Sequence, residues 1–260
     1  MAGDERELLA YDDIGQGPAV VLVHGLTFSR RTWDPLVERL CDRFRCISVD
    51  SPGHGDSAGS GADLTVVLRR LHATLTALGV PAPVVVGHSA GALAATGYAA
   101  GYPVAGVVNV DQPLVFGPFG AFLQQQAAGL AGPEFEAAFA PFEQSIGVDH
   151  LPEPERTRVA GTRQVDQRTV LDHWQLPLTT PPDALQRLVD EMLDAITVPY
   201  LYLTGHEPPP PLLQHLAAHL DGLETVVWPG GGHLVHLAEP DRFADLVADF
   251  AERTTSAASA

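Results

Sequence analysis

The chain has 260 residues, of which 45% are hydrophobic and 18% charged, and this suits one globular domain or a catalytic domain with an insertion. Its formal net charge is −17, and all 15 cationic residues are arginines. This charge disfavours nucleic acids and anionic membrane surfaces as partners. The lack of lysine excludes Schiff-base chemistry through a lysine side chain.

The sequence has no feature typical of export or membrane insertion. No stretch approaches about 18 consecutive apolar residues, and the first seven residues are polar and acidic, unlike a signal peptide. We therefore expect a cytoplasmic protein. Cys41 and Cys46 are the two cysteines; we expect reduced thiols, and two cysteines alone form no zinc site.

Short apolar runs alternate with helical stretches, a pattern that predicts βαβ units and a largely parallel sheet. Runs that are apolar throughout indicate strands buried on both faces. The predicted strands are Glu7–Asp12 at an edge, Ala19–Val23, Phe44–Val49, Pro83–Val86, Val104–Val110, Val198–Leu203 and Leu223–Trp228. The predicted helices include Leu64–Leu78, Ala90–Ala100, Pro211–Leu220 and Pro240–Glu252, with a disordered tail from Thr254 to Ala260.

The alternation stops between Gln112 and Ala195. This segment contains six of the ten phenylalanines and no clear strand, so we expect a helical cap (112–195) inserted into a core made of residues 1–111 and 196–260. Its aromatic residues are expected to line an apolar pocket. Phe116 and Trp174 are candidates for substrate contact, with packing between cap helices as the alternative for each ring.

The sequence Gly87-His88-Ser89-Ala90-Gly91 follows an apolar strand and opens an alanine-rich helix. This is the context in which G-x-S-x-G holds a serine on a tight turn, because the glycines let neighbouring backbones approach closely. The helix N-terminus offers free N–H groups to a developing oxyanion. We therefore predict that Ser89 is a nucleophile and that Ala90 contributes an oxyanion-hole N–H group.

A serine nucleophile needs a base, and His233 is the candidate. It follows the strand Leu223–Trp228 and the glycine-rich stretch Pro229–Gly232, which would let the imidazole reach the sheet edge. His236, three residues later, is the rival and is expected to lie inside the following turn.

The early loop His24-Gly25-Leu26 follows the strand Ala19–Val23. A backbone N–H group of Leu26 would pair with that of Ala90 to complete the oxyanion hole. His24 is expected to support this loop rather than to act as a base. His24 and Gly25 are also candidates for lining the substrate site.

Taken together, these motifs resemble those of the α/β-hydrolase superfamily over essentially the whole chain. The matching landmarks occur in the family's order: His24-Gly25, Asp50–Ser57, Gly87–Gly91, Gly232-His233 and Glu239-Pro240. The resemblance implies an α/β-hydrolase fold, with a mostly parallel central sheet flanked by helices and a helical cap after the sixth strand of the usual core. It also implies that the reaction needs no metal or organic cofactor.

The acidic member of the triad departs from the common family pattern. Most relatives place it in a G-x-x-D turn after the strand that corresponds to Val198–Leu203, where this chain reads Gly205-His206-Glu207-Pro208. Some branches, including several haloalkane dehalogenases, instead place the acid where this chain has Asp111. We favour Asp111 as the acid, with Glu207 as the alternative.

These residues predict hydrolysis of a carboxylic ester or lactone through an acyl-serine intermediate. The phenylalanine-rich cap suggests a small to medium, apolar or aromatic substrate as the partner, and a homodimer is left open. Two alternatives stay open: a lyase or cyclase that uses Ser89 and His233 only as acid and base, and a non-catalytic protein that retains the ligand pocket.

Overall fold

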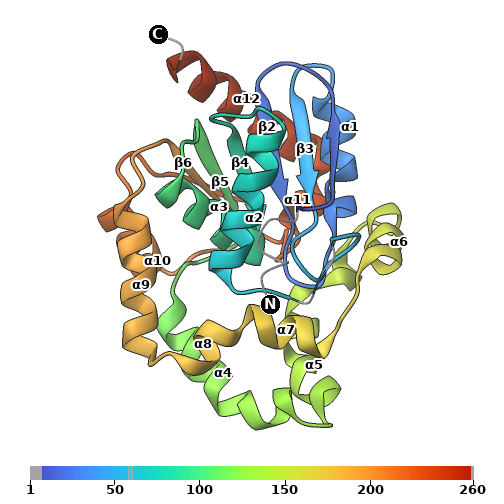
Figure 1. Ribbon diagram of the computed structural model, residues 1–260, viewed down its shortest axis with the longest axis vertical. Coiled ribbons are helices and arrows are strands. Elements are labelled where there is room, and N and C mark those ends of the chain that lie inside the picture. The colour runs from blue at the N-terminus through green and yellow to red at the C-terminus, as the bar shows by residue number, and fades with distance from the viewer. Residues whose placement is uncertain (1–7, 58, 60, 259–260) are drawn as a thin grey trace.

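The computed structural model describes residues 8–57, 59 and 61–258 (Figure 1). Its centre is a seven-stranded sheet in the order β1-β3-β2-β4-β5-β6-β7. β1 pairs antiparallel with β3, and every other neighbouring pair is parallel, which confirms the predicted sheet. The strands are β1 (Tyr11–Ile14), β2 (Ala19–Val23), β3 (Arg45–Val49), β4 (Val84–His88), β5 (Gly106–Val110), β6 (Tyr200–Thr204) and β7 (Glu224–Val227).

Helices cover both faces of the sheet, which is why its central strands are mostly apolar. Side chains alternate along β2: Val21 packs toward α2 and α3, whereas Val20 packs toward α1 and α12. Burial of each such valine contributes about 1.5–3 kcal/mol. The first face carries α2 (Leu64–Ala77), α3 (Ala90–Gly101) and α10 (Pro210–His219); the second carries α1 (Asp34–Leu40) and α12 (Pro240–Ala258).

The two ends of the chain differ from the sequence-based prediction. The edge strand lies at Tyr11–Ile14 rather than Glu7–Asp12, and Glu7 lies outside the described residues. The strand begins late because side-chain hydroxyl groups of Thr74 and Ser57 accept the N–H groups of Leu9 and Ala10.

The predicted disordered tail is wrong for most of its length, because α12 continues to Ala258. The hydroxyl group of Thr254 donates to the Phe250 carbonyl group at 3.0 Å, and Thr254 is buried. A threonine that bonds back to the preceding turn can stay inside a helix without leaving its hydroxyl group unpaired.

A helical insertion (residues 116–194) separates β5 from β6 and lies beyond one end of the sheet (Figure 1). In this chain it follows the fifth described strand, because the described part of the chain has a single strand before β2. Its α-helices are α4 (Phe116–Ala131), α5 (Phe135–Ile146), α6 (Glu153–Thr162), α7 (Gln167–His173), α8 (Gln175–Thr179) and α9 (Pro182–Asp194).

Shorter elements complete the fold. They are η1 (Arg30–Trp33), η2 (Val148–His150) and α11 (Val235–Ala238). Cys41 and Cys46 are both free thiols, and burial raises the pKa of Cys46 to about 12, so this thiol stays protonated. Among the helices of the described residues, none is both long enough and apolar enough to cross a bilayer.

Candidate active site

Ser89 lies on a strained turn between β4 and α3. Its backbone has φ 52° and ψ −122°, an unusual conformation for a residue with a side chain. Gly87 and Gly91 make the turn feasible: a Cβ atom at Gly87 would lie 2.1 Å from the Gly91 carbonyl oxygen, and one at Gly91 would lie 2.1 Å from that of Val23. Strain of this kind costs about 1–3 kcal/mol and concentrates at functional sites.

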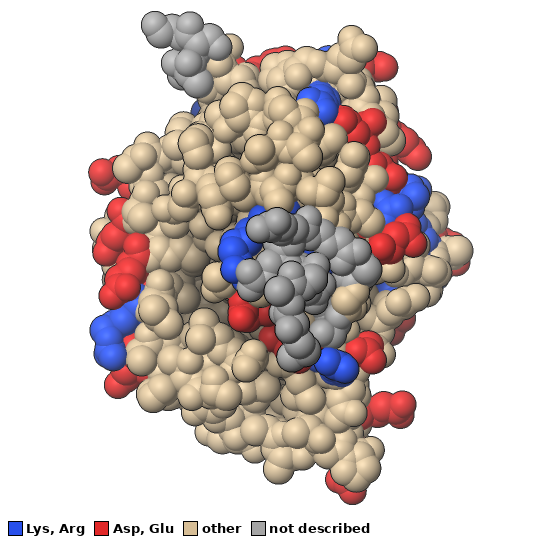
Figure 2. Space-filling view, viewed as in Figure 1, with Lys and Arg blue, Asp and Glu red and all other residues tan. Residues whose placement is uncertain are grey.

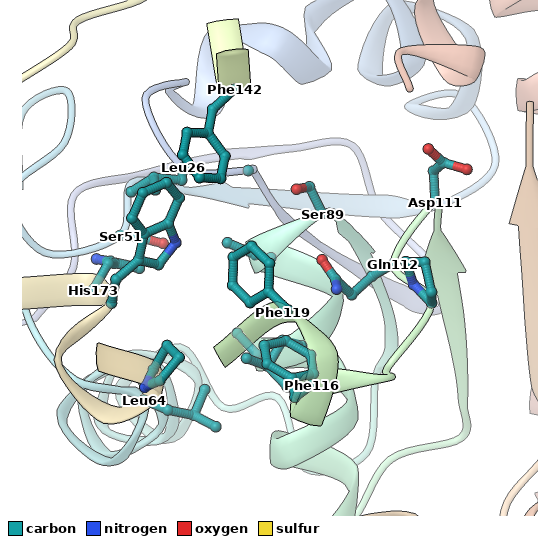
Figure 3. Close-up of a pocket in the computed structure, with 18 of the residues that line it drawn as sticks. Leu26, Ser51, Leu64, Ser89, Asp111, Gln112, Phe116, Phe119, Phe142 and His173 are labelled. Atoms are coloured by element: carbon teal, nitrogen blue, oxygen red, sulfur yellow. The ribbon is translucent and has the colours of Figure 1, made fainter. Parts of the chain in front are cut away.

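The Ser89 turn is tied to the neighbouring strand. The Ser89 N–H group donates to the Val110 carbonyl group at 2.9 Å, directly beside Asp111. Figure 3 shows the Ser89 hydroxyl group directed into a cavity, with Asp111 on the other side of Ser89.

Asp111, directly after β5, and His233, on the loop after β7, form a close pair. Nδ1 of His233 lies 2.8 Å from Oδ2 of Asp111, and the carboxylate side chain is only 8% exposed. A carboxylate accepts hydrogen bonds, so Nδ1 carries the proton and Nε2 is the basic nitrogen. This arrangement orients an imidazole for use as a base.

Thr204, at the end of β6, holds the other oxygen of Asp111. Its hydroxyl group donates to Asp111 Oδ1 at 2.6 Å and accepts from the His206 N–H group at 3.2 Å. No sequence motif pointed to Thr204. Thr204 lies one residue beyond the predicted strand Val198–Leu203, and its partner follows only from the register in which Leu203 lies opposite Val110.

The rival residues lie elsewhere. Glu207 is exposed on the turn after β6. His236 is buried in α11, with its ring 5.0 Å from that of Trp33 and 4.5 Å from that of His88. Burial lowers the pKa of His236 to about 3 and keeps it neutral. An exposed Glu207 is poorly placed to act as the acid, and a buried His236 is poorly placed to act as the base.

His88, the second residue of the G-x-S-x-G motif, anchors the loop that carries His233. Its Nε2–H group donates to the His233 carbonyl group at 2.9 Å. The ring of His88 also explains why residue 25 is a glycine, because a Cβ atom there would lie 2.9 Å from His88 Nδ1. The motif identified the serine but gave no sign of this support.

Two neutral histidines fix the loop after β2. Nε2 of His24 accepts the Ser51 N–H group at 3.0 Å, and its Nδ1–H group donates to the Gly25 carbonyl group at 2.7 Å. Nε2 of His54 accepts the N–H group of Thr27 at 3.1 Å. Burial lowers the pKa of His24 to about 3, so it supports the loop as a neutral ring.

Leu26 and Ala90 line the same cavity as Ser89. Ala90 is the first residue of α3, so its N–H group has no partner four residues earlier in the helix.

The cavity has a volume of about 460 Å³ and lies between the sheet and the helical insertion. The core contributes Ser89, His233, Asp111, His24 and Gly25 to its wall. The insertion contributes aromatic rings, and in Figure 3 Phe142 and Phe119 lie on the cavity side of Ser89, with Phe116 beyond Phe119. These aromatic lining residues are Phe116, Phe119, Phe139, Phe142 and Trp174.

The fold, with a serine on the strand–turn–helix element between β4 and α3, is that of the α/β-hydrolase class. The model of the alpha/beta hydrolase family matches residues 20–246, and the chain belongs to that family.

Relatives of known sequence or structure agree with this membership. The chain is 28% identical to a pimeloyl-[acyl-carrier protein] methyl ester esterase of Yersinia enterocolitica, over 95% of this chain and 99% of that protein. It is 27% identical to an uncharacterised protein of Mycobacterium tuberculosis, over 95% and 79% of the two chains. A thermophilic esterase from Thermogutta terrifontis has a similar fold, with a TM-score of 0.73 and 22% identity over 95% and 93% of the chains.

Proposed function

We propose that the protein is a serine hydrolase that cleaves a carboxylic ester or lactone. The observation that carries this proposal is the 2.8 Å contact between His233 and Asp111 beside a serine held on a strained turn. The esterase named among the relatives supports the same reaction class.

In this mechanism Ser89 attacks the substrate carbonyl carbon while Nε2 of His233 accepts the hydroxyl proton. Asp111 stabilises the resulting imidazolium ion through the bond to Nδ1. N–H groups of Leu26 and Ala90 donate to the oxyanion, and each such donor typically contributes about 3 kcal/mol. The C–O bond then breaks, His233 returns its proton to the leaving oxygen, and water activated by His233 releases the acid.

The substrate proposed is apolar or aromatic and of small to medium size. The supporting observation is the cavity of about 460 Å³, with five aromatic rings from the helical insertion in its wall. Pockets of this size take small organic ligands. In this proposal the insertion (residues 116–194) acts as a cap, and Phe116 and Trp174 contact the substrate.

The test is turnover of a panel of p-nitrophenyl esters and aryl lactones by the wild type and by Ser89→Ala. We expect hydrolysis that falls by several orders of magnitude in the variant, together with an acyl adduct on Ser89 when a slow ester is analysed by intact mass. A folded protein that neither hydrolyses the panel nor forms an adduct would favour acid–base lyase or cyclase chemistry. Tight ligand binding without turnover would favour a binding protein.

A further inference from the structure

A second cluster of functional groups lies away from the cavity, where α9 of the helical insertion meets α10 of the core (Figure 1). Asp190 and Asp194 are four residues apart on α9, and His215 and His219 are four residues apart on α10. Side chains spaced in this way share one helix face. Each helix therefore presents a pair of potential ligands to the other.

Asp190 lies between the two imidazoles. Its Oδ1 is 3.5 Å from Nε2 of His215 and 3.9 Å from Nε2 of His219. One ligand atom from each of the three residues lies within 4.8 Å of the other two. In a tetrahedral zinc site with bonds of 2.0–2.2 Å, ligand atoms are about 3.4 Å apart, so small side-chain rotations would close this group around an ion.

Asp194 adds an observation that is independent of these distances. Nδ1 of His219 lies 2.7 Å from Asp194 Oδ1, which places the proton on Nδ1 and leaves Nε2 as the free ligand atom on the side of Asp190. Metal-ligating histidines almost always donate their other N–H group to a carboxylate, a backbone carbonyl group or water. Asp194 therefore orients His219 as such a carboxylate does in metal sites.

We propose that Asp190, His215 and His219 bind a divalent transition-metal ion of the zinc class, with water as the fourth ligand. Two imidazoles and one carboxylate suit Zn²⁺ or Co²⁺, whereas Mg²⁺ and Ca²⁺ prefer oxygen ligands alone. The three side chains are 20–28% exposed, so an ion can reach them from solvent. The negative charge of the chain favours cation binding, and Figure 2 shows acidic side chains along the edge where α9 and α10 lie.

A bound ion would cross-link the helical insertion to the core. The ligands come from the last helix of the insertion and from the helix that follows β6. Gln186, one turn before Asp190, donates to Asp190 Oδ1 at 2.7 Å and accepts the N–H group of Phe116, which lines the cavity. An ion bound at Asp190 would therefore restrain a segment that is in contact with the cavity wall, without entering the reaction.

The experiment is calorimetric titration of the full chain with Zn²⁺, with Co²⁺ as a spectroscopic probe. We expect one Zn²⁺ per chain, a tetrahedral Co²⁺ absorption spectrum and a higher Tm with Zn²⁺ but not with Mg²⁺. His219→Ala and Asp190→Asn should each weaken Zn²⁺ binding more than 100-fold. Asp194→Asn removes only the orienting carboxylate and should cost about 10–100-fold.

Two variants control for other histidines. His150 is exposed on η2, and His233 lies in the cavity, so His150→Ala and His233→Ala should bind Zn²⁺ as the wild type does. The metal-free Tm of each variant checks that it is folded. Binding that survives His219→Ala, binding that is lost with His233→Ala, or no binding at millimolar Zn²⁺ would overturn the proposal.

Discussion

Asp111→Asn tests the assignment of the acid most sharply. Thr204 donates to Oδ1 of Asp111, so an asparagine would keep its carbonyl oxygen there and place its NH₂ group where Oδ2 now faces His233. The amide would donate to Nδ1 and force the imidazole proton onto Nε2. His233 could then no longer accept the serine proton. A wrong tautomer of this kind lowers kcat by about 10⁴, equivalent to about 5.5 kcal/mol.

The assay is steady-state hydrolysis of the best ester from the panel, with Glu207→Gln as the matched control. Glu207 is exposed, so its amide variant should retain kcat within about twofold. The KM of Asp111→Asn should change little because the bond acts on His233 rather than on the substrate. A loss below tenfold in Asp111→Asn, or a large loss in Glu207→Gln, would refute the assignment.

Three further predictions follow from the surrounding contacts. Thr204→Val removes a hydrogen bond to a charged group, worth about 1.5–3 kcal/mol, and should lower kcat about 10–150-fold if all of it supports the transition state. Gly91→Ala should lower the free energy of unfolding by at least about 3 kcal/mol, whereas Gly101→Ala, with open space around its Cβ position, should be neutral or stabilising. His236→Leu should reduce acid sensitivity, since the buried ring has a pKa of about 3 against an ordinary value of about 6.5.

The sign of the pH effect follows from proton uptake on unfolding. Below about pH 6.5, His236 becomes protonated in the unfolded chain but stays neutral in the folded chain. The contribution of His236 to the free energy of unfolding is therefore retained above that pH and falls as the pH decreases toward 3. At pH 5 the resulting loss in the free energy of unfolding is about 2 kcal/mol. Urea unfolding at pH 5 and pH 8 measures it; equal pH dependence in wild type and His236→Leu would contradict the prediction.

Steady-state kinetics test Thr204→Val, and urea unfolding tests the glycine variants. Unchanged kcat in Thr204→Val would show that Asp111 is held without the hydroxyl group. Urea unfolding compares the two glycine variants, and a Gly91→Ala protein as stable as Gly101→Ala would show that the Ser89 turn relaxes away from β2.

The strands, the flanking helices and the tight turn at Ser89 were predictable because they rest on local patterns. Apolar runs, glycine spacing and the strand–turn–helix context all lie within a few residues of one another. The late His233 followed from its position after the last strand.

The contacts that support Asp111 and His233 from residues distant in sequence were not predictable. Thr204 reaches Asp111 across 93 residues, and His88 reaches the His233 backbone across 145. Such contacts depend on the register of the strands and on glycines that let two loops approach each other closely. No local sequence pattern specifies either feature. The α12 extension was missed because its polar, alanine-rich end looks disordered until Thr254 is seen to be buried.

Reaction with a fluorophosphonate, followed by intact mass, tests most directly whether Ser89 is an activated nucleophile. The account predicts one adduct per wild-type chain, none on Ser89→Ala, and a greatly slowed reaction with His233→Ala. An adduct that persists in Ser89→Ala, or no adduct on folded wild-type protein, would contradict it.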